Sequence, residues 1–293
     1  MTQLSASGVM PEISSLRLCF YGAGSMAEAF VRGILDRGLT EPGQISVMNR
    51  QNVTRLDELT TRYGIRAAAD DQSKLSTLHE ADIIFLAMKP KDAATALKQL
   101  RGLIKPHQLL ISLVAGLSID TITALLNQQN AIIRTMPNTS STIGLGATGI
   151  SFSSSVTEAQ RLLAEQLLQS IGLTAIVEEP LLDVVTGVSG SGPAYVYYLM
   201  EAMIEAGRGL GLSEDTARDL TIQTVLGAAH MVKATNENPA DLRRKVTSPG
   251  GTTQAAIETL DSHHFSKAII TAIGRAAERA GEMGAEIERS AKS

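Results

Sequence analysis

Two glycine-containing turns carry the residues of this sequence that are best suited to chemistry. The first, GAGSMA, runs from Gly22 to Ala27 after the apolar run LRLCFY, and the second, SPGGTT, runs from Ser248 to Thr253 before a helical pattern. A glycine turn that opens a helix exposes unpaired backbone N–H groups at the positive end of the helix dipole, and this arrangement binds anions. The sequence therefore predicts an anion site in each half of the chain.

The first turn has the G-x-G-x-x-A spacing of a dinucleotide-binding fingerprint. Gly22 suits a tight turn, Gly24 lets a pyrophosphate approach the backbone, and Ala27 keeps the helix close to the strand. The pattern follows the first predicted strand of an alternating α/β chain, which is the context that the fingerprint requires. An ordinary glycine turn is the alternative interpretation.

The end of the second predicted strand bears on which nicotinamide cofactor binds. Enzymes that prefer NAD commonly place Asp or Glu at this point, whereas the strand QISVM ends in Asn49 and Arg50. No carboxylate is present to repel a 2′-phosphate, and Arg50 can pair with one. The sequence therefore favours NADP(H) and leaves some use of NAD(H) open, with a solvated loop arginine as the alternative.

Three further segments follow predicted strands, at the edge of the sheet where ligands bind in open α/β folds. The segment LAMKP (Leu86–Pro90) places Lys89 where it can reach a phosphate or a ribose, and SLVAG (Ser112–Gly116) ends the next strand. The segment MPNT (Met136–Thr139) follows a strand on the same edge. A solvent-exposed lysine and a simple turn are the alternatives to cofactor contacts.

These turns require an α/β scaffold to position them. Short apolar runs alternate with helical patterns up to Val177, and after Pro180 long Ala- and Gly-rich helical patterns take over. The alternation of strand and helix patterns up to Val177 predicts right-handed crossovers and a mainly parallel sheet covered on both faces. We expect a polar leader at 1–15, a Rossmann-like NADP-binding domain at 16–180, and an all-helical substrate and dimerisation domain at 181–293.

The elements predicted from these patterns have the following bounds. The strands are Leu16–Tyr21, Gln44–Asn49, Ile83–Met88, Leu109–Leu113, Ala131–Met136, Thr148–Phe152 and Thr174–Val177. The helices between them are Met26–Arg37, Val53–Tyr63, Asp92–Leu100, Ile119–Leu126 and Thr157–Ser170. The later helices are Ala194–Arg208, Ser213–Thr235, Thr252–Leu260 and Ser266–Ala291.

Composition limits the classes of protein. The 293 residues, 44% hydrophobic and 19% charged, are typical of a soluble globular protein of about two domains. The net charge of -4 argues against a nucleic-acid partner, and no apolar run approaches the roughly 18 residues of a membrane span. The N-terminus lacks the residue order of a signal peptide.

The cysteine and histidine content bears on the redox compartment and on metal binding. Cys19 is the only cysteine, which fits a reducing cytoplasm, and we expect it to be a buried apolar side chain rather than a reactive thiol. The five histidines are scattered, so the sequence predicts no metal site.

Taken together, the motifs resemble the pyrroline-5-carboxylate reductase family. The resemblance extends from about Leu16 to Met283 and is carried most specifically by SGSGPAY and SPGGTT. Further matching stretches are FYGAGSMAEA, LAMKP, SLVAG, RTMPNTSSTIGLGAT and LTIQTVLGAAHMV. The resemblance implies an enzyme that reduces 1-pyrroline-5-carboxylate to L-proline with NAD(P)H, the last step of proline biosynthesis. It also implies an intertwined homodimer, often assembled further.

The resemblance implies site residues as well. The cofactor-binding residues are Gly22, Ala23, Gly24, Ser25 and Met26 at the phosphates, Asn49 and Arg50 near the adenosine ribose, and Ala87, Met88, Lys89, Pro90 and Ala115 along the rest. The substrate loop comprises Ser248, Gly250, Gly251, Thr252 and Thr253. Some members carry alanine in place of Thr252, which matters little if its backbone N–H makes the contact.

The implied substrate is a cyclic imine with a carboxylate. Backbone N–H groups of the Gly250–Thr253 turn would capture the carboxylate. A protonated imine accepts hydride without a strong side-chain acid, so Thr253, the expected catalytic residue, would align the C=N bond through its hydroxyl. A hydrogen bond at the helix N-terminus is the alternative role for Thr253.

Two other functions stay open at this point. A β-hydroxyacid dehydrogenase shares the two-domain plan but needs a general base, commonly a lysine early in the helical domain. The corresponding stretch here, TGVSGSGPAYVYYLMEA, contains no Lys, His or Asp. A non-catalytic NADP-binding regulator would keep the cofactor fold, but the complete SPGGTT loop weighs against it.

Overall fold

The computed structural model describes residues 12–292 and their side chains up to residue 290. Contacts between residues divide the chain into two compact units. The first extends to Gly190 and resumes at Arg275, and the second is Ser191–Gly274. The sequence placed a domain boundary at residue 180, after the last strand, whereas the contacts place the division at Gly190 and return the chain end to the first unit.

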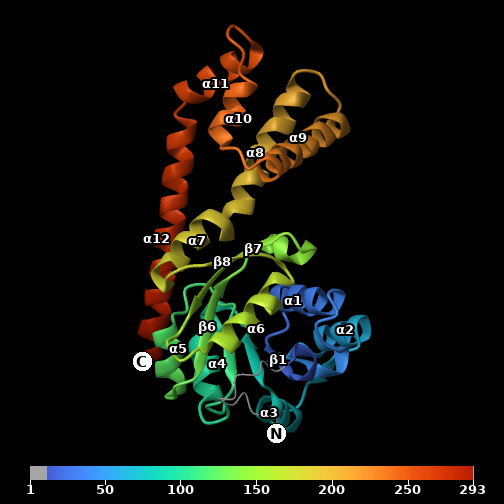
Figure 1. Ribbon diagram of the computed structural model, residues 1–293, viewed down its shortest axis with the longest axis vertical. Helices are drawn as coiled ribbons and strands as arrows, with labels where there is room; N and C mark the ends of the chain where they lie inside the picture. Colours follow the sequence, from blue (N-terminus) through green and yellow to red (C-terminus); the bar gives the residue numbers. More distant parts are fainter. Residues whose placement is uncertain (1–11, 293) are drawn as a thin grey trace. The chain divides into compact units, whose positions relative to one another are not determined.

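The first unit is built on an eight-stranded sheet with the order β3-β2-β1-β4-β5-β6-β7-β8. Figure 1 shows this sheet with helices packed around it. Every neighbouring pair is parallel except β6 and β7. The predicted Rossmann-type, mainly parallel sheet is therefore confirmed. The strands are β1 (Leu18–Tyr21), β2 (Ile45–Met48), β3 (Arg66–Ala68), β4 (Ile83–Leu86), β5 (Leu109–Ser112), β6 (Ala131–Met136), β7 (Gly146–Phe152) and β8 (Gly172–Ile176).

Seven α-helices lie wholly in the first unit, and three of its elements, β3, α3 and the short α7, lie where no helix or strand was predicted. The short strand β3 was missed because only Ala68 in it is buried, and α3 was missed because Leu78 is its one buried residue. The helices are α1 (Ser25–Asp36), α2 (Val53–Tyr63), α3 (Asp71–Glu80), α4 (Ala93–Leu100), α5 (Ile119–Leu126), α6 (Glu158–Gln169) and α7 (Leu182–Val185).

Alternating strand residues build two separate hydrophobic cores, one on each face of the sheet. Phe20 belongs to the core formed with α1, α2 and α6. Its neighbour Cys19 belongs to the core formed with α3, α4, α5 and the end of α12 (Phe265–Lys292). Cys19 is fully buried, and this burial raises the pKa of its thiol to about 12. It is therefore the buried apolar side chain that was expected.

The segment before the sheet is partly described. Residues 1–11 of the predicted polar leader lie outside the described residues. The remainder forms a 3₁₀ turn, Ile13–Ser15, and Ile13 is buried in the same core as Phe20. The end of the expected leader therefore contributes to the first hydrophobic core.

Every regular element described in the second unit is helical. They are α8 (Gly192–Gly209), α9 (Glu214–Thr235), α10 (Pro239–Lys245), α11 (Thr252–Ser262) and the first part of α12. Of the described residues in this unit, Ala217 and Thr221 alone are fully buried. The helical pattern expected after Pro180 is confirmed, with α7 and α10 as additional short helices.

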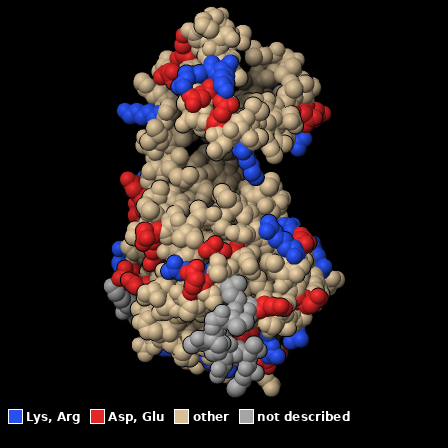
Figure 2. All heavy atoms as spheres, in the orientation of Figure 1, with Lys and Arg blue, Asp and Glu red and all other residues tan. Residues whose placement is uncertain are grey.

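Large apolar side chains of the second unit lie on its surface. Tyr198 is 77% exposed and Leu210 is 88% exposed. On the face drawn in Figure 2, positive and negative side chains are interspersed, and broad areas carry neither. Within residues 12–292, no helix combines the length and apolar character needed to cross a bilayer.

Candidate active site

The turn after β1 is packed against the ends of two neighbouring strands. The N–H of Gly22 donates to the carbonyl oxygen of Met48, 2.9 Å away at the end of β2. A Cβ at Gly22 would lie 2.4 Å from the carbonyl oxygen of Ala87, and the residue has a φ of +126°. Only glycine fits both constraints. The turn therefore lies between β1 and β4, where the strand order reverses and ligands bind in such sheets.

The N-terminus of α1 offers unpaired donors next to this turn. Gly24 caps the helix with no side-chain hydrogen bond. Within the described part of the chain, the N–H groups of Gly24, Ser25 and Met26 have no acceptor. A Cβ on Gly24 would meet no atom within 4 Å, so the protein itself leaves space over this residue. These features fit the pyrophosphate of a dinucleotide.

An aromatic cluster lies in the hydrophobic core next to this turn. The rings of Phe20 in β1 and Phe85 in β4 are stacked with centroids 4.3 Å apart, and Phe30 of α1 lies 5.5 Å from Phe85. Ala27 is fully buried against this core. Helix α1 is therefore held firmly to the strand that leads into the turn.

The segment after β2 carries Asn49 and Arg50, the two residues expected near the adenosine ribose, and their side chains make different interactions. Asn49 uses its side chain within the loop, since its Oδ1 accepts from Asn52 N at 2.9 Å and its Nδ2 donates to Asn52 O at 2.6 Å. Arg50 is 76% exposed, and its Nη1 lies 3.8 Å from Asp92 Oδ1. The guanidinium of Arg50 is thus accessible, with one carboxylate nearby that the sequence reasoning did not anticipate.

The other expected cofactor residues of the first unit also lie at strand ends. Ala87, Met88 and Pro90 are half-buried, whereas Lys89 is exposed at the start of a 3₁₀ turn. Ala115 is half-buried shortly after β5. The structure therefore brings the Gly22 turn and the end of β4 into direct contact and places Lys89 in solvent.

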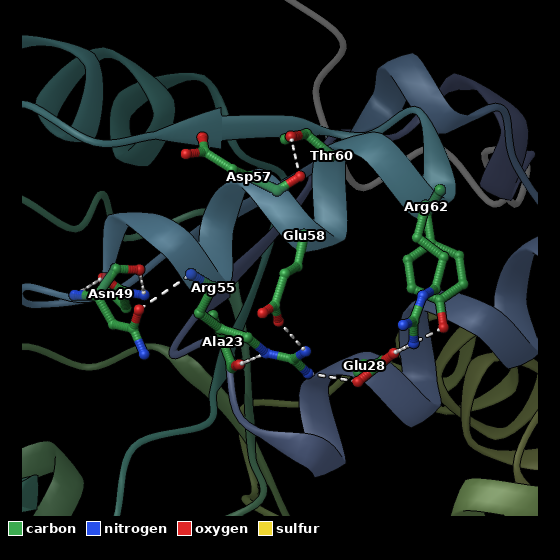
Figure 3. Close-up of polar contacts among 10 residues, drawn as sticks. Ala23, Glu28, Asn49, Arg55, Asp57, Glu58, Thr60 and Arg62 are labelled. Atoms are coloured by element: carbon green, nitrogen blue, oxygen red, sulfur yellow. Dashed lines mark hydrogen bonds and ion pairs between the residues drawn. The ribbon is translucent and has the colours of Figure 1, made fainter.

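A polar network joins the glycine turn to α2, as Figure 3 shows. Glu28 of α1 is ion-paired with Arg55 and, at 2.8 Å, with Arg62. It also accepts a hydrogen bond from the hydroxyl of Tyr63 at 2.9 Å. Burial by itself raises the pKa of the Glu28 carboxyl. Hydrogen bonds from Arg55 and Tyr63 and the charges of both arginines lower the pKa by more than burial raises it, so the pKa lies below its usual value.

Sequence reasoning did not identify this network. Its members lie in α1 and α2 at separations of 27 to 35 residues. Glu28 in the first turn of α1 was the one available signal, because a carboxylate beside a predicted phosphate site repels the phosphate unless a positive charge neutralises it.

In the second unit, the SPGGTT turn is stabilised by one backbone hydrogen bond of its own and by the side chain of Gln254 in α11. Gly250 has a φ of +73°. Its N–H donates to Gln254 Oε1 at 2.7 Å, and the N–H of Gly251 donates to the carbonyl oxygen of Ser248 at 3.0 Å. Two of the N–H groups expected to bind an anion are therefore already engaged, one within the turn and one with the side chain of Gln254.

The first turn of α11 keeps other donors free. Among the described residues, no acceptor bonds the N–H groups of Thr252 and Thr253. Helix α11 is capped by Gly251 without a side-chain hydrogen bond, and the half-buried Thr253 makes no side-chain hydrogen bond within residues 12–292. The anion-binding capacity of this turn therefore lies in the N–H groups of α11, and the Thr253 hydroxyl is unused.

No group of three or more His, Cys, Asp or Glu is placed to hold a metal ion in the part of the chain that the structure describes.

A Rossmann sheet, a glycine turn at the reversal of strand order and a following helical unit together define a class. This is the class of two-domain oxidoreductases that depend on a nicotinamide dinucleotide.

Comparison with known proteins specifies the family. Residues 17–116 match a family model described as NADP oxidoreductase coenzyme F420-dependent, and residues 179–283 match one described as pyrroline-5-carboxylate reductase dimerisation. Pyrroline-5-carboxylate reductase 2 of Bacillus subtilis is 44% identical over 93% of this chain and 99% of its own.

Solved structures agree with this assignment. A pyrroline-5-carboxylate reductase from Coxiella burnetii is 36% identical, with a TM-score of 0.84 over 92% of this chain and 98% of its own. The Plasmodium falciparum pyrroline carboxylate reductase, solved with NADP bound, is 27% identical, with a TM-score of 0.81 over 92% of this chain and 99% of its own.

This chain belongs to the pyrroline-5-carboxylate reductase family. The expected family, the fold class and an NAD(P)-dependent oxidoreductase are confirmed. NADP as cofactor is confirmed as well. The hydroxyacid dehydrogenase and the non-catalytic regulator are therefore set aside.

Proposed function

We propose that this protein reduces 1-pyrroline-5-carboxylate to L-proline with NADPH, using the two glycine turns as its anion sites. The observation that carries the proposal is that each glycine turn precedes a helix whose first N–H groups have no acceptor among the described residues, in a chain of this family. A dinucleotide and a carboxylated imine are two anionic ligands, and the two glycine turns offer one helix start for each.

The cofactor is assigned to the first unit. The N–H groups of Gly24, Ser25 and Met26 would bind its pyrophosphate, and the exposed guanidinium of Arg50 would pair with the 2′-phosphate. Ala87, Met88, Lys89, Pro90 and Ala115 would line the remainder from the ends of β4 and β5. Asn49 contributes by shaping the loop that presents Arg50.

The substrate carboxylate is assigned to the start of α11. The N–H groups of Thr252 and Thr253 would bind it. The hydrogen bonds from Gly251 to Ser248 and from Gly250 to the side chain of Gln254 would maintain the turn. Thr252 acts through its backbone, which explains why other family members can carry alanine at this point.

Bound NADPH supplies the hydride that adds to the imine carbon. The protonated imine nitrogen takes up the electrons of the C=N π bond and becomes the secondary amine of proline, so atoms and charges balance without a further acid. The Thr253 hydroxyl, which has no partner among the described residues, would hydrogen-bond this nitrogen and hold the C=N bond in one orientation.

We further propose a cytoplasmic homodimer. The match to a dimerisation model over residues 179–283 and the exposed apolar side chains of the second unit support the assembly. A single cysteine, buried as a free thiol, suits a reducing compartment.

The direct test is NADPH oxidation by the purified protein with 1-pyrroline-5-carboxylate, run beside a panel of 3-hydroxyacids with NADP. We expect turnover with the imine alone and formation of one proline per NADPH consumed. Turnover with a hydroxyacid and none with the imine would contradict the proposal.

A further inference from the structure

Arg55 makes an unusual set of contacts for a residue outside the glycine turn. It lies in the first turn of α2, and its side chain is 23% exposed. Its Nε donates to the carbonyl oxygen of Ala23 at 3.1 Å, its Nη1 to Glu58 at 3.1 Å, and its Nη2 to Glu28 (Figure 3). All three nitrogens of the guanidinium are therefore engaged, and one of them holds the backbone of the turn.

The contact with Ala23 fixes the direction of a neighbouring donor. In a planar trans peptide, the carbonyl oxygen and the following N–H point in opposite directions. Because Arg55 binds the Ala23 oxygen from the side of α2, the N–H of Gly24 points away from α2. That N–H has no acceptor among the described residues, and no atom lies within 4 Å of a Cβ built on Gly24.

The same arginine is anchored to the loop that carries Arg50. The backbone N–H of Arg55 donates to Asn52 Oδ1 at 3.0 Å. Asn52 in turn is joined to Asn49 by the two hydrogen bonds between their side chain and backbone atoms. One short chain of hydrogen bonds therefore connects the end of β2 with the Ala23 peptide of the glycine turn.

Charge in the first turn of α1 gives the network a second effect. An unpaired carboxylate at Glu28 would oppose the phosphates expected at this helix start. Arg55 and Arg62 both pair with Glu28, but Arg55 alone also contacts Ala23. The two arginines therefore share the electrostatic role and differ in the contact with the peptide.

We propose that Arg55 is a positioning residue for the cofactor, which holds the Ala23–Gly24 peptide so that the N–H of Gly24 faces the pyrophosphate. This inference rests on the proposed binding of NADPH at the glycine turn. The pyrophosphate is common to NADPH and NADH, so Arg55 acts on both cofactors equally, in contrast to Arg50.

The test compares Arg55→Met with the matched control Arg62→Met. Each change removes one positive charge and one partner of Glu28, and only the first releases the Ala23 oxygen. NADPH and NADH affinities are measured by fluorescence titration, together with kcat at saturating cofactor and melting temperature. We expect Arg55→Met to weaken both cofactors by the same factor, about 5- to 20-fold, with little change in kcat. Arg62→Met should change either affinity by less than about twofold.

Arg55→Lys separates charge from geometry and carries the test if Arg55→Met does not fold. A lysine ammonium can pair with Glu28, but it lacks the planar fork that reaches Ala23 as well. We therefore expect Arg55→Lys to bind both cofactors as weakly as Arg55→Met. Wild-type affinity in Arg55→Lys, or an equal loss in Arg62→Met, would overturn the positioning role.

The two proposals fail in different ways. If the wild-type protein binds NADPH but does not reduce the imine, the proposed function is wrong and the role of Arg55 can still be measured. If the wild-type protein reduces the imine and Arg55→Met binds both cofactors normally, the inference about Arg55 is wrong.

Discussion

The glycines of the two turns are required for different physical reasons. Gly22 has both a positive φ and a neighbouring carbonyl oxygen where a Cβ would lie, so any side chain would displace β4 or the turn. Gly250 has a positive φ of +73° with open space around it, so an added side chain there costs backbone strain alone. The first turn is therefore set by packing and the second by local backbone conformation.

At the residue scale, we expect the choice between NADPH and NADH to depend on one exposed side chain, that of Arg50. Arg50→Asp places a carboxylate where the 2′-phosphate is expected, beside the existing carboxylate of Asp92. We expect NADPH to bind more weakly through repulsion while NADH is spared. The measurement is the ratio of kcat/KM for the two cofactors, and an unchanged ratio would remove Arg50 from the account of specificity.

We propose Thr253 as the residue that orients the imine. Thr253→Ala removes a hydroxyl that has no partner among the described residues, and α11 loses no cap because Gly251 caps it. Loss of a hydrogen bond that strengthens in the transition state should cost about 2–3 kcal/mol, or roughly 30- to 150-fold in turnover.

The control for this prediction is Thr253→Ser, which keeps the hydroxyl and should keep most activity. Substrate affinity should fall less than turnover, because the carboxylate is proposed to bind backbone N–H groups. A Thr253→Ala variant with normal turnover and a lowered melting temperature would show that the side chain is structural.

At the scale of elements, one arginine joins a strand to the segment that follows the sheet. Arg134 of β6 is 8% exposed and pairs with Glu179 at 3.2 Å and Asp183 at 3.1 Å. Glu179 also accepts the N–H of Ile119, at 2.8 Å, at the start of α5. Strand β6, helix α5 and helix α7 are therefore held together by one set of charged groups.

This arrangement predicts a loss of stability from a single change. Arg134→Ala leaves two carboxylates without their partner, although both are more than a quarter exposed, which reduces the cost. We expect the free energy of unfolding to fall by about 2–3 kcal/mol. Denaturant titration measures it, and Arg17→Ala, which breaks a surface pair with Glu80, should cost less than about 1 kcal/mol.

At the scale of the whole molecule, the two units differ in how they use apolar residues. The first unit encloses two cores on its sheet, while the described part of the second buries Ala217 and Thr221 alone. Long helices with exposed apolar side chains need a further surface to cover them. A second copy of the chain supplies that surface in the proposed homodimer.

Light scattering after size exclusion tests this assembly. We expect a mass at least twice that of the 31.1 kDa chain. The double variant Ile222→Glu, Leu226→Glu charges two exposed residues one helical turn apart on α9, and it should lower the mass or cause precipitation. Leu145→Glu, at a residue of the first unit that is 68% exposed, serves as the control. A stable and active wild-type monomer would contradict the assembly.

Much of the fold could be predicted because its signals are local. Apolar alternation and helical periodicity act over a few residues, and they indicated seven of the eight strands and the four longest helices after Pro180. Strand β3 and helix α3 escaped because each buries one residue, so their formation depends on neighbours in the sheet rather than on their own pattern. The two glycine turns were recognisable because each motif, with its glycines and their spacing, lies within a few consecutive residues.

The tertiary structure alone decided which polar groups within the sites are available. The sequence counted the N–H groups of Gly250 and Gly251 among the anion donors, but in the folded protein they bond to the Gln254 side chain and to the Ser248 carbonyl oxygen. It also gave no sign that Arg55 holds the Ala23 carbonyl, 32 residues away. A hydrogen bond selects its partner by distance and direction in space, and the sheet order that places α2 beside the glycine turn arises only when the strands pair.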